Sequence, residues 1–207
     1  MFLHAILDVD VAAAHGWDVG DLARAFIGGG APIIQLRAKH LASGPFLALC
    51  DLVVELAQPS SSRVIVNDRA DLARMAQAAG VHVGQEDLAP AAARALVGEG
   101  AVVGCSTHSV EQVDAAVHEP VDYIAVGPVF GTRTKDTGYN AVGLELVATA
   151  AARVQGRPIV AIGGITLETA PSVAAAGAAG VAVISDLIAH GDPALRVAAY
   201  VAALSRL

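Results

Sequence analysis

The chain alternates eight short apolar runs with eight Ala-rich segments of helical periodicity, and this alternation limits the fold more than any other feature. The short runs are mostly uniformly apolar, which is typical of parallel strands covered on the outside by helices. The expected strands are residues 3–7, 32–36, 63–66, 81–83, 101–104, 123–126, 158–162 and 180–184. The expected helices are residues 21–27, 44–57, 70–78, 89–97, 110–117, 144–154, 167–175 and 193–204. A doubly wound sheet usually has fewer strands, so we predict an α/β fold, a single (β/α)8 TIM barrel.

Helix-start and helix-stop residues agree with this division of the chain. Ser43, Ser109 and Thr166 stand where three of the helices should begin, and residues 78–80 and 176–177 end in glycine where two should stop. No linker, low-complexity tract or block of charge separates one part of the chain from another. We therefore expect residues 1–207 to form one catalytic domain.

Composition narrows the class of protein and its partners. Hydrophobic residues make up 55% and charged residues 16%, which excludes a disordered chain. The net charge of −7 argues against a nucleic-acid partner, and no apolar run is long enough to span a bilayer. The start of the chain lacks a secretion signal, and Cys50 and Cys105 lie in apolar segments, so we expect reduced core cysteines and a cytoplasmic protein. An acidic protein that binds anionic small molecules must gather its cations in one pocket.

The loop after the sixth expected strand has the residues of a phosphate site. Gly127 and Gly131 permit a sharp turn and a close approach to a ligand. Between and beyond them the loop carries two hydroxyls and two cations, Thr132, Arg133, Thr134 and Lys135. Such a loop suits a phosphate or pyrophosphate. The alternative is a solvated turn with two surface cations.

The second strand ends in a set of polar residues on one side. Alternation places Gln35, Arg37 and Lys39 on one face and Leu36 on the other. An amide and two cations that converge at the active-site end of a barrel form an anion site. Solvated cations at an exposed strand end are the alternative.

The third and fourth strands end in aspartates, Asp68 and Asp87. Two carboxylates at neighbouring strand ends can hold Mg²⁺ together with phosphate oxygens of a substrate. Aspartate is also a common helix cap, and this remains the alternative for both. We favour metal binding for Asp68 and Asp87, and a cap or solvent for Asp71 and Glu86.

The remaining strand ends carry a hydroxyl, a histidine and paired glycines. Ser106 is a candidate ligand donor, and His108 is either an acid–base group or a hydrogen-bonded structural residue. His82, within a strand, is expected to be a satisfied core residue. Gly163 and Gly164 follow the seventh strand, where such barrels often bind phosphate through backbone N–H groups, although Gly163 could serve only the turn.

Taken in order, these segments resemble the thiamine-phosphate synthase family. The resemblance rests on residues 35–39, 67–69, 84–87, 127–135 and 161–165 and covers nearly the whole chain. It implies an eight-stranded α/β barrel that joins an aminopyrimidine diphosphate to a thiazole phosphate, or to its carboxylate, and releases pyrophosphate. His40 and the first strand, which lacks an aromatic residue, depart from the family pattern.

The resemblance also implies roles for individual residues. The pyrimidine diphosphate would be held by Gln35, Leu36, Arg37, Ala38, Lys39, Asn67, Ser106 and Lys135. Mg²⁺ would be held by Asp68 and Asp87. The thiazole phosphate would be held by Thr132, Arg133, Thr134, Gly164, Ile184 and Ser185. Arg37, Lys39 and Lys135 would act in catalysis, because they neutralise the charge that builds on the departing diphosphate.

Two other functions fit parts of this pattern. The related thiazole tautomerase shares the barrel and the thiazole-phosphate pocket and would use His108, but it needs no pyrophosphate and metal site. A non-catalytic sensor of phosphate ligands would bind the same molecules and release no pyrophosphate. Residues 131–143 are the candidate for a loop that closes over the site. The sequence leaves open whether the protein forms a homo-oligomer.

Overall fold

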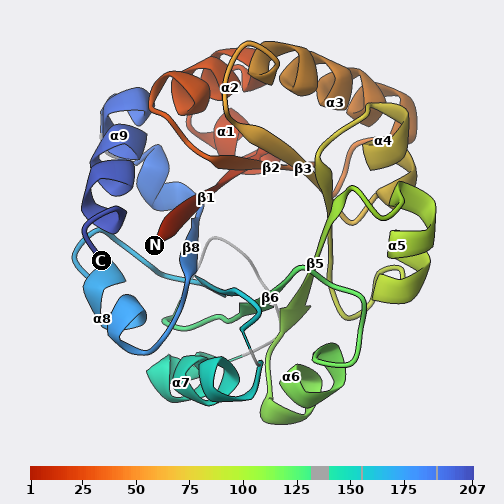
Figure 1. Ribbon diagram of the computed structural model, residues 1–207. Coiled ribbons are helices and arrows are strands. Elements are labelled where there is room, and N and C mark those ends of the chain that lie inside the picture. The colour runs from red at the N-terminus through yellow and green to blue at the C-terminus, as the bar shows by residue number, and fades with distance from the viewer. Residues whose placement is uncertain (132–139, 155, 190) are drawn as a thin grey trace.

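The computed structural model describes residues 1–131, 140–154, 156–189 and 191–207. Its strands are all parallel and close in chain order into a barrel, β1-β2-β3-β4-β5-β6-β7-β8, with β8 paired to β1. Figure 1 looks down the barrel axis and shows the helices arranged in a ring around the strands. The strands are β1 (Phe2–Asp8), β2 (Ile33–Arg37), β3 (Arg63–Asn67), β4 (Gly80–Val83), β5 (Val102–Thr107), β6 (Tyr123–Val126), β7 (Ile159–Ile162) and β8 (Gly180–Val183). The predicted TIM barrel is confirmed.

The helices follow the strands with a few differences from the predicted pattern. They are α1 (Val9–Ala14), α2 (Val19–Gly28), α3 (Ser43–Ala57), α4 (Ala70–Met75), α5 (Pro90–Val97), α6 (Val110–Ala116), α7 (Gly143–Arg153), α8 (Ala170–Ala175) and α9 (Pro193–Leu204), with a short 3-10 helix η1 (Ser185–Leu187). Neither α1 nor η1 was predicted, because each is too short to show a helical period. Helix α4 ends three residues before the predicted stop, and Gln77 beyond it has a φ of 53°.

The predicted helix caps are partly correct. Ser109 caps α6 and accepts a hydrogen bond from the Gln112 N–H at 3.3 Å. The prediction for Ser43 is wrong, since Ala42 holds the cap position of α3 and makes no side-chain cap bond. Helix α8 begins at Ala170, three residues later than predicted, because Thr166 and Thr169 form a separate turn joined by a hydrogen bond of 2.9 Å. These errors change helix ends and leave the strand order intact.

The hydrophobic core has two parts, one outside and one inside the barrel. The outer part packs the helices against the strands and includes Phe26, Leu36 and Tyr200. The inner part is small, and Ile6 and Val160 are among its buried members. Cys50 and Cys105 are buried and free, as predicted.

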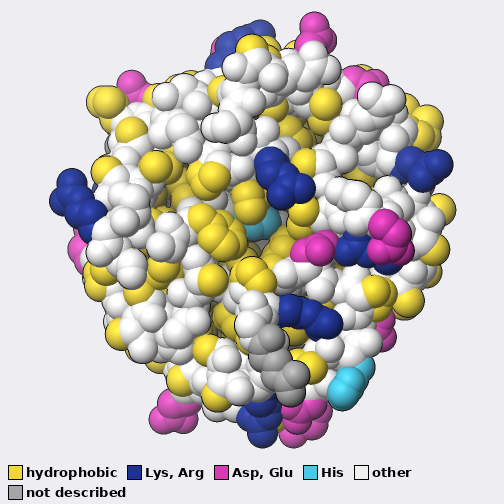
Figure 2. Space-filling view, viewed as in Figure 1, with side chains coloured by type: hydrophobic (Ala, Val, Ile, Leu, Met, Phe, Trp, Pro, Cys, Tyr) yellow, Lys and Arg dark blue, Asp and Glu magenta, His cyan; other side chains and the backbone are white. Residues whose placement is uncertain are grey.

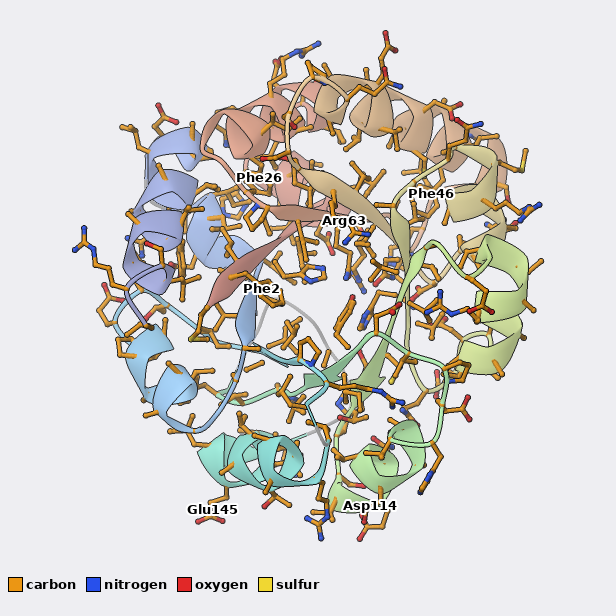
Figure 3. All side chains as sticks on the ribbon, in the orientation of Figure 1. Phe2, Phe26, Phe46, Arg63, Asp114 and Glu145 are labelled. Carbon is orange, nitrogen blue, oxygen red and sulfur yellow. The ribbon has the colours of Figure 1, made fainter. Side chains whose placement is uncertain are left out.

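Figures 1–3 view the end of the barrel at which the strands begin. Figure 3 labels Phe2 and Arg63, which start β1 and β3, near the centre of the view. The space-filling view of this end shows mostly hydrophobic and uncharged atoms around the barrel centre, where a histidine side chain is visible below the surface (Figure 2). The polar strand ends that were predicted to form the site lie at the opposite end of the barrel.

Candidate functional site

The ends of β2, β3 and β4 bring a lysine and two aspartates together. The Lys39 ammonium lies 2.5 Å from the Asp68 carboxylate and 3.8 Å from the Asp87 carboxylate. Burial and the neighbouring Asp87 raise the pKa of Asp68. Asp68 also has a φ of 65°, a left-handed conformation that is uncommon for residues other than glycine. Two carboxylates that share one cation are an arrangement that a divalent ion would stabilise.

The helix-cap alternative for these aspartates is wrong. The cap position of α4 is Arg69, and no side chain makes a cap bond there. The same holds for Ala89 at the start of α5. Asp87 instead accepts a hydrogen bond from the Gly84 N–H at 2.8 Å. Among the described residues no group of three His, Cys, Asp or Glu side chains is arranged to hold a metal, so any ion at this pair needs further oxygens from substrate or water.

Arg37 stands beside this group and is held by Asp8 at the end of β1. The two residues are opposite each other in the sheet, and the Arg37 guanidinium donates to the Asp8 carboxylate. The other Asp8 oxygen caps α1 by accepting from the N–H groups of Asp10 and Val11 at 3.1 Å each. The Arg37 Nε is buried and has no hydrogen-bond partner among the described residues. An unused cationic donor at the edge of the site fits an anionic ligand.

Beneath the polar strand ends, the barrel interior holds hydrogen-bonded aromatic and polar side chains. His82 makes bonds of 2.8 Å to the Tyr123 hydroxyl and 2.8 Å to the Ser106 hydroxyl, so it is satisfied as predicted. Its ring also stacks on Tyr123, with centroids 5.5 Å apart. Gly104 makes room for this ring, since a Cβ there would lie 2.0 Å from the Tyr123 Cζ. The network thus fixes the position of Ser106.

His4 and Gln35 extend the interior polar group toward β1. Their side chains meet at 3.0 Å, between the Gln35 Nε2 and the His4 Nε2. The amide nitrogen can only donate, so the His4 Nε2 accepts and its proton lies on Nδ1. That atom is buried without a hydrogen-bond partner among the described residues. Burial lowers the pKa of His4 to about 4.

A pocket opens beside this group, over the ends of β5 to β8. It encloses about 610 Å³ with its open mouth and is lined by Ser106, His108, Gly127, Pro128 and residues 162–165 and 182–186. The predicted ligand residues Ser106, Gly164, Ile184 and Ser185 therefore share one cavity. Most of its walls are hydroxyl, backbone and aliphatic groups, which suit an apolar ring that carries a phosphate. His108 and Asp186 add an imidazole and a carboxylate to the lining.

The two glycines after β7 are needed because both have a positive φ and both lie in close contact with the loop after β6. Gly163 and Gly164 have φ values of 101° and 63°. A Cβ on Gly163 would lie 2.6 Å from the Pro128 Cα, and one on Gly164 would lie 2.8 Å from the Gly131 carbonyl oxygen. The loop after β6 therefore packs directly on the loop after β7. Gly163 faces the pocket wall as well as making the turn.

Hydrogen bonds hold both ends of the loop that follows β6. The Val129 and Phe130 N–H groups donate to the carbonyls of Ile162 and Gly163 at 2.8 and 3.0 Å. On the return, the Val142 N–H donates to the Pro128 carbonyl at 2.8 Å. Most of the predicted closing loop, and the predicted ligands Thr132, Arg133, Thr134 and Lys135, lie outside the described residues.

His108 lies in the wall of the pocket. Its Nδ1 is 2.5 Å from the Gly127 carbonyl oxygen, which can only accept, so Nδ1 carries the proton. Its backbone N–H donates to the Gln112 side chain at 2.7 Å. These contacts fit the structural role that the sequence left open beside the acid–base role.

The structure brings most of the predicted site residues to one end of the barrel, and two polar residues that the sequence did not indicate join them. Asn67 is buried at the end of β3, next to Asp68. Leu36 and Ala38 belong to the outer core, so only their backbone atoms can face a ligand. Asp8 and Tyr123 were missed as polar partners, because each lies in an apolar run and finds its partner across the sheet.

Comparison with known proteins identifies the family. The thiamine monophosphate synthase family matches residues 9–187. The thiamine-phosphate synthase of Acidothermus cellulolyticus is 43% identical over 182 residues, which cover 87% of this chain and 85% of that protein. The chain belongs to the thiamine monophosphate synthase family. The thiamine-phosphate synthase of Koribacter versatilis, another relative, is 40% identical over 200 residues, 96% of this chain and 93% of that protein.

Solved structures agree with the family assignment. A thiamine phosphate pyrophosphorylase from Pyrococcus furiosus superposes with a TM-score of 0.89 at 27% identity and covers 99% of this chain and 96% of that one. A 3-hexulose-6-phosphate synthase superposes with a TM-score of 0.69 at 19% identity, over 98% of this chain and 99% of that one, which shows a shared fold alone. Residues 9–187 span the structure from α1 to η1, so the family match includes both the charged strand ends and the pocket.

Proposed function

We propose that this transferase condenses 4-amino-2-methyl-5-(diphosphooxymethyl)pyrimidine with 4-methyl-5-(2-phosphoethyl)thiazole, or its carboxylate, to give thiamine phosphate and pyrophosphate. The observation that carries the proposal is that a charged group suited to a diphosphate adjoins a pocket, mostly of hydroxyl, backbone and aliphatic groups, that is suited to a phosphorylated ring. Both lie at the end of the barrel where such folds place their active sites. The relatives named above carry the same activity in their names.

We assign the pyrimidine diphosphate to the ends of β2–β5. Arg37 and Lys39 supply positive charge there, and Asn67 and Ser106 supply hydrogen bonds beside them. Lys135 is assigned to the same substrate by the family resemblance. Asp68 and Asp87 would hold Mg²⁺, which fits their shared cation and the raised pKa of Asp68. Bound Mg²⁺ would supply positive charge to the diphosphate oxygens.

We assign the thiazole phosphate to the pocket at β5–β8. Gly164, Ile184 and Ser185 line it. The positive φ of Gly164 turns the backbone at the pocket wall, where N–H groups can meet a phosphate. Thr132, Arg133 and Thr134 belong to this assignment by resemblance.

The chemistry that these groups favour is departure of a diphosphate followed by attack on carbon. The bond between the pyrimidine CH₂ and the diphosphate oxygen breaks, and its electron pair leaves with the diphosphate. Arg37, Lys39 and Lys135 stabilise that charge, which lowers the barrier. The thiazole nitrogen then gives its lone pair to the CH₂ carbon, and no protein nucleophile or strong base takes part. Holding the two rings together supplies a further part of the rate enhancement.

The test is a coupled pyrophosphate-release assay with both substrates and Mg²⁺. We expect release that requires both substrates, with thiamine phosphate formed in equal amount. No release with Mg²⁺ present would reject the proposal. Conversion of the thiazole carboxylate to its isomer would instead indicate the tautomerase reaction, and binding without turnover would indicate a sensor.

No helix among the residues that the structure describes is both long and apolar enough to cross a membrane. The proposed partners are the two small-molecule substrates and Mg²⁺.

A further inference from the structure

Asp186 places a carboxylate at the pocket that we assign to the thiazole phosphate. It lines that pocket beside Ser185 and follows Ile184 at the end of β8. Its side chain is only 11% exposed. A free carboxylate this close to a phosphate would repel it, because both carry negative charge. The surroundings of Asp186 therefore decide whether the pocket accepts an anion.

Helix α9 supplies a cation that pairs with this carboxylate. The Arg196 Nη2 and Nε lie 2.7 and 3.2 Å from the same oxygen of Asp186. The Arg196 Nε also lies 3.3 Å from the Asp186 backbone carbonyl oxygen. The Arg196 side chain is 19% exposed, so solvent screens this pair less than an exposed one. Asp186 is thus neutralised from outside the pocket.

Tyr200, one turn further along α9, touches both loops of the pocket. Its hydroxyl donates to the carboxylate oxygen of Asp186 that Arg196 also binds. The same hydroxyl lies 3.5 Å from the carbonyl oxygen of Ile165, which lines the pocket from the loop after β7. Tyr200 is fully buried, and burial together with Asp186 raises the pKa of its hydroxyl, which stays protonated as a donor. One side chain therefore sets the spacing between two loops.

Helix α9 is itself firmly placed. Asp192 caps its start by accepting from the Ala194 N–H at 2.8 Å. At its other end, the amino terminus of Met1 donates to the Leu204 carbonyl at 3.0 Å. The Arg196 guanidinium also lies 5.5 Å from the centre of the Tyr200 ring, so the two side chains support each other.

We infer that Arg196 and Tyr200 are positioning residues for the thiazole-phosphate subsite, which neutralise Asp186 and fix the loops after β7 and β8 relative to each other. The inference rests on the proposed function. Neither residue needs to touch the substrate. Their effect should appear in the affinity for the thiazole phosphate and be absent from the affinity for the pyrimidine diphosphate.

The test compares a variant that loses the Arg196 charge with one that keeps it and with one that also loses the Asp186 charge. In Arg196→Met, we expect the KM for thiazole phosphate to rise at least tenfold, while the KM for pyrimidine diphosphate changes less than twofold. The double variant Asp186→Asn with Arg196→Met should recover most of that loss, because the repelling charge is gone. Arg196→Lys keeps the charge and should stay within about threefold of the parent protein. Tyr200→Phe keeps the ring and should show an intermediate loss.

Arg153→Met is the matched control. Arg153 on α7 pairs with Asp114 on α6 at 2.9 Å, another arginine–aspartate pair between elements, but both side chains are about half exposed and do not line the pocket. We expect no change in either KM.

Three outcomes would overturn the inference. They are an equal rise of both KM values in Arg196→Met, a double variant as impaired as the single one, or Arg196→Met behaving like Arg153→Met. Thermal unfolding of every variant, together with calorimetric binding of thiazole phosphate alone, separates a folding defect from a lost subsite. If the parent protein binds thiazole phosphate but releases no pyrophosphate, the proposed reaction fails while the binding measurements still decide the inference. If it binds no thiazole phosphate, both fail.

Discussion

The two halves of the barrel's active-site end offer different chemical groups to the two phosphate ligands that we propose for them. The ends of β1–β4 use charged side chains, with Asp8 behind Arg37 and with Asp68 beside Lys39. The ends of β5–β8 use glycines, hydroxyls and backbone, and the charge of Asp186 is cancelled by Arg196. A diphosphate that departs takes negative charge with it, which cationic side chains can neutralise, whereas a phosphate that only anchors a ring needs hydrogen-bond donors at fixed positions. We call the ends of β1–β4 the charged half and the ends of β5–β8 the cradle half. The difference predicts that damage to one half should spare the affinity of the other.

The largest expected effect comes from the charged half. Asp68→Ala should lower kcat/KM about 1,000-fold, or about 4 kcal/mol, because Mg²⁺ would lose one of its two carboxylates. The melting temperature should not fall, since burial and Asp87 already disfavour the charged form of Asp68. Asp71→Ala is the control: it removes an aspartate three residues away that is half exposed and pairs with Arg69. Comparable loss of activity in both variants would contradict the assignment.

The second effect is a pH dependence of the free energy of unfolding, which arises from His4, buried in the barrel interior next to Gln35. The unfolded chain binds a proton on His4 near pH 6.5, whereas the folded protein binds it only near pH 4. The contribution of His4 to the free energy of unfolding is therefore complete above about pH 6.5 and falls as the pH drops toward 4, by roughly 3 kcal/mol.

His4→Phe should remove this part of the acid sensitivity. Urea unfolding of both proteins at pH 7 and pH 4 measures it, and His118→Gln, at an exposed site, should leave it unchanged. Parallel losses of stability in the parent protein and in His4→Phe would count against a buried neutral His4.

The third effect lies in the cradle half. In Gly164→Ala the new Cβ would lie 2.8 Å from the Gly131 carbonyl oxygen and 2.9 Å from the Phe130 Cβ, so the two loops must separate. We expect the KM for thiazole phosphate to rise about 30-fold, or about 2 kcal/mol, with little change for pyrimidine diphosphate. Gly98→Ala is the control for backbone strain without a steric clash, because Gly98 has a φ of 86° and an added Cβ would have no neighbour within 4 Å. It should lower stability and leave both KM values unchanged.

The smallest effect concerns the support of Arg37. Asp8→Ala removes both the partner of Arg37 and the cap of α1, so we expect about a tenfold loss in kcat/KM and about 1 kcal/mol or more of stability. Asp18→Ala removes the corresponding cap of α2, where Asp18 accepts from the Gly20 N–H at 2.8 Å. Equal activities in the two variants would show that Asp8 serves only as a cap.

The sequence predicted the strand order and most of the charged half, because these depend on local patterns. Alternation on β2 placed Gln35 and Arg37 toward the site and Leu36 toward the helices, as the structure has them. The carboxylates at adjacent strand ends followed from the order of strands in a barrel. Short elements such as α1 were not predictable, because six residues give too few turns to show a period.

What the sequence did not show are contacts between residues far apart in the chain. Asp8 follows the apolar run of the first expected strand, and its pairing with Arg37 depends on the register of β1 and β2. Tyr123 stands in the apolar run of the sixth expected strand, and its bond to His82 crosses the barrel interior. Arg196 and Tyr200 lie on a helix whose pattern indicates only burial, yet both reach Asp186. Such partners become visible only when the barrel is closed.

The central claim, that the charged half and the cradle half bind separate substrates, is tested most directly by calorimetric binding of two ligands to two variants. Pyrophosphate with Mg²⁺ and thiazole phosphate are each titrated into the parent protein, Asp68→Ala and Gly164→Ala. We predict that Asp68→Ala loses pyrophosphate and keeps thiazole phosphate, and that Gly164→Ala does the reverse. Loss of both ligands in both variants, or of neither ligand in either one, would contradict the account.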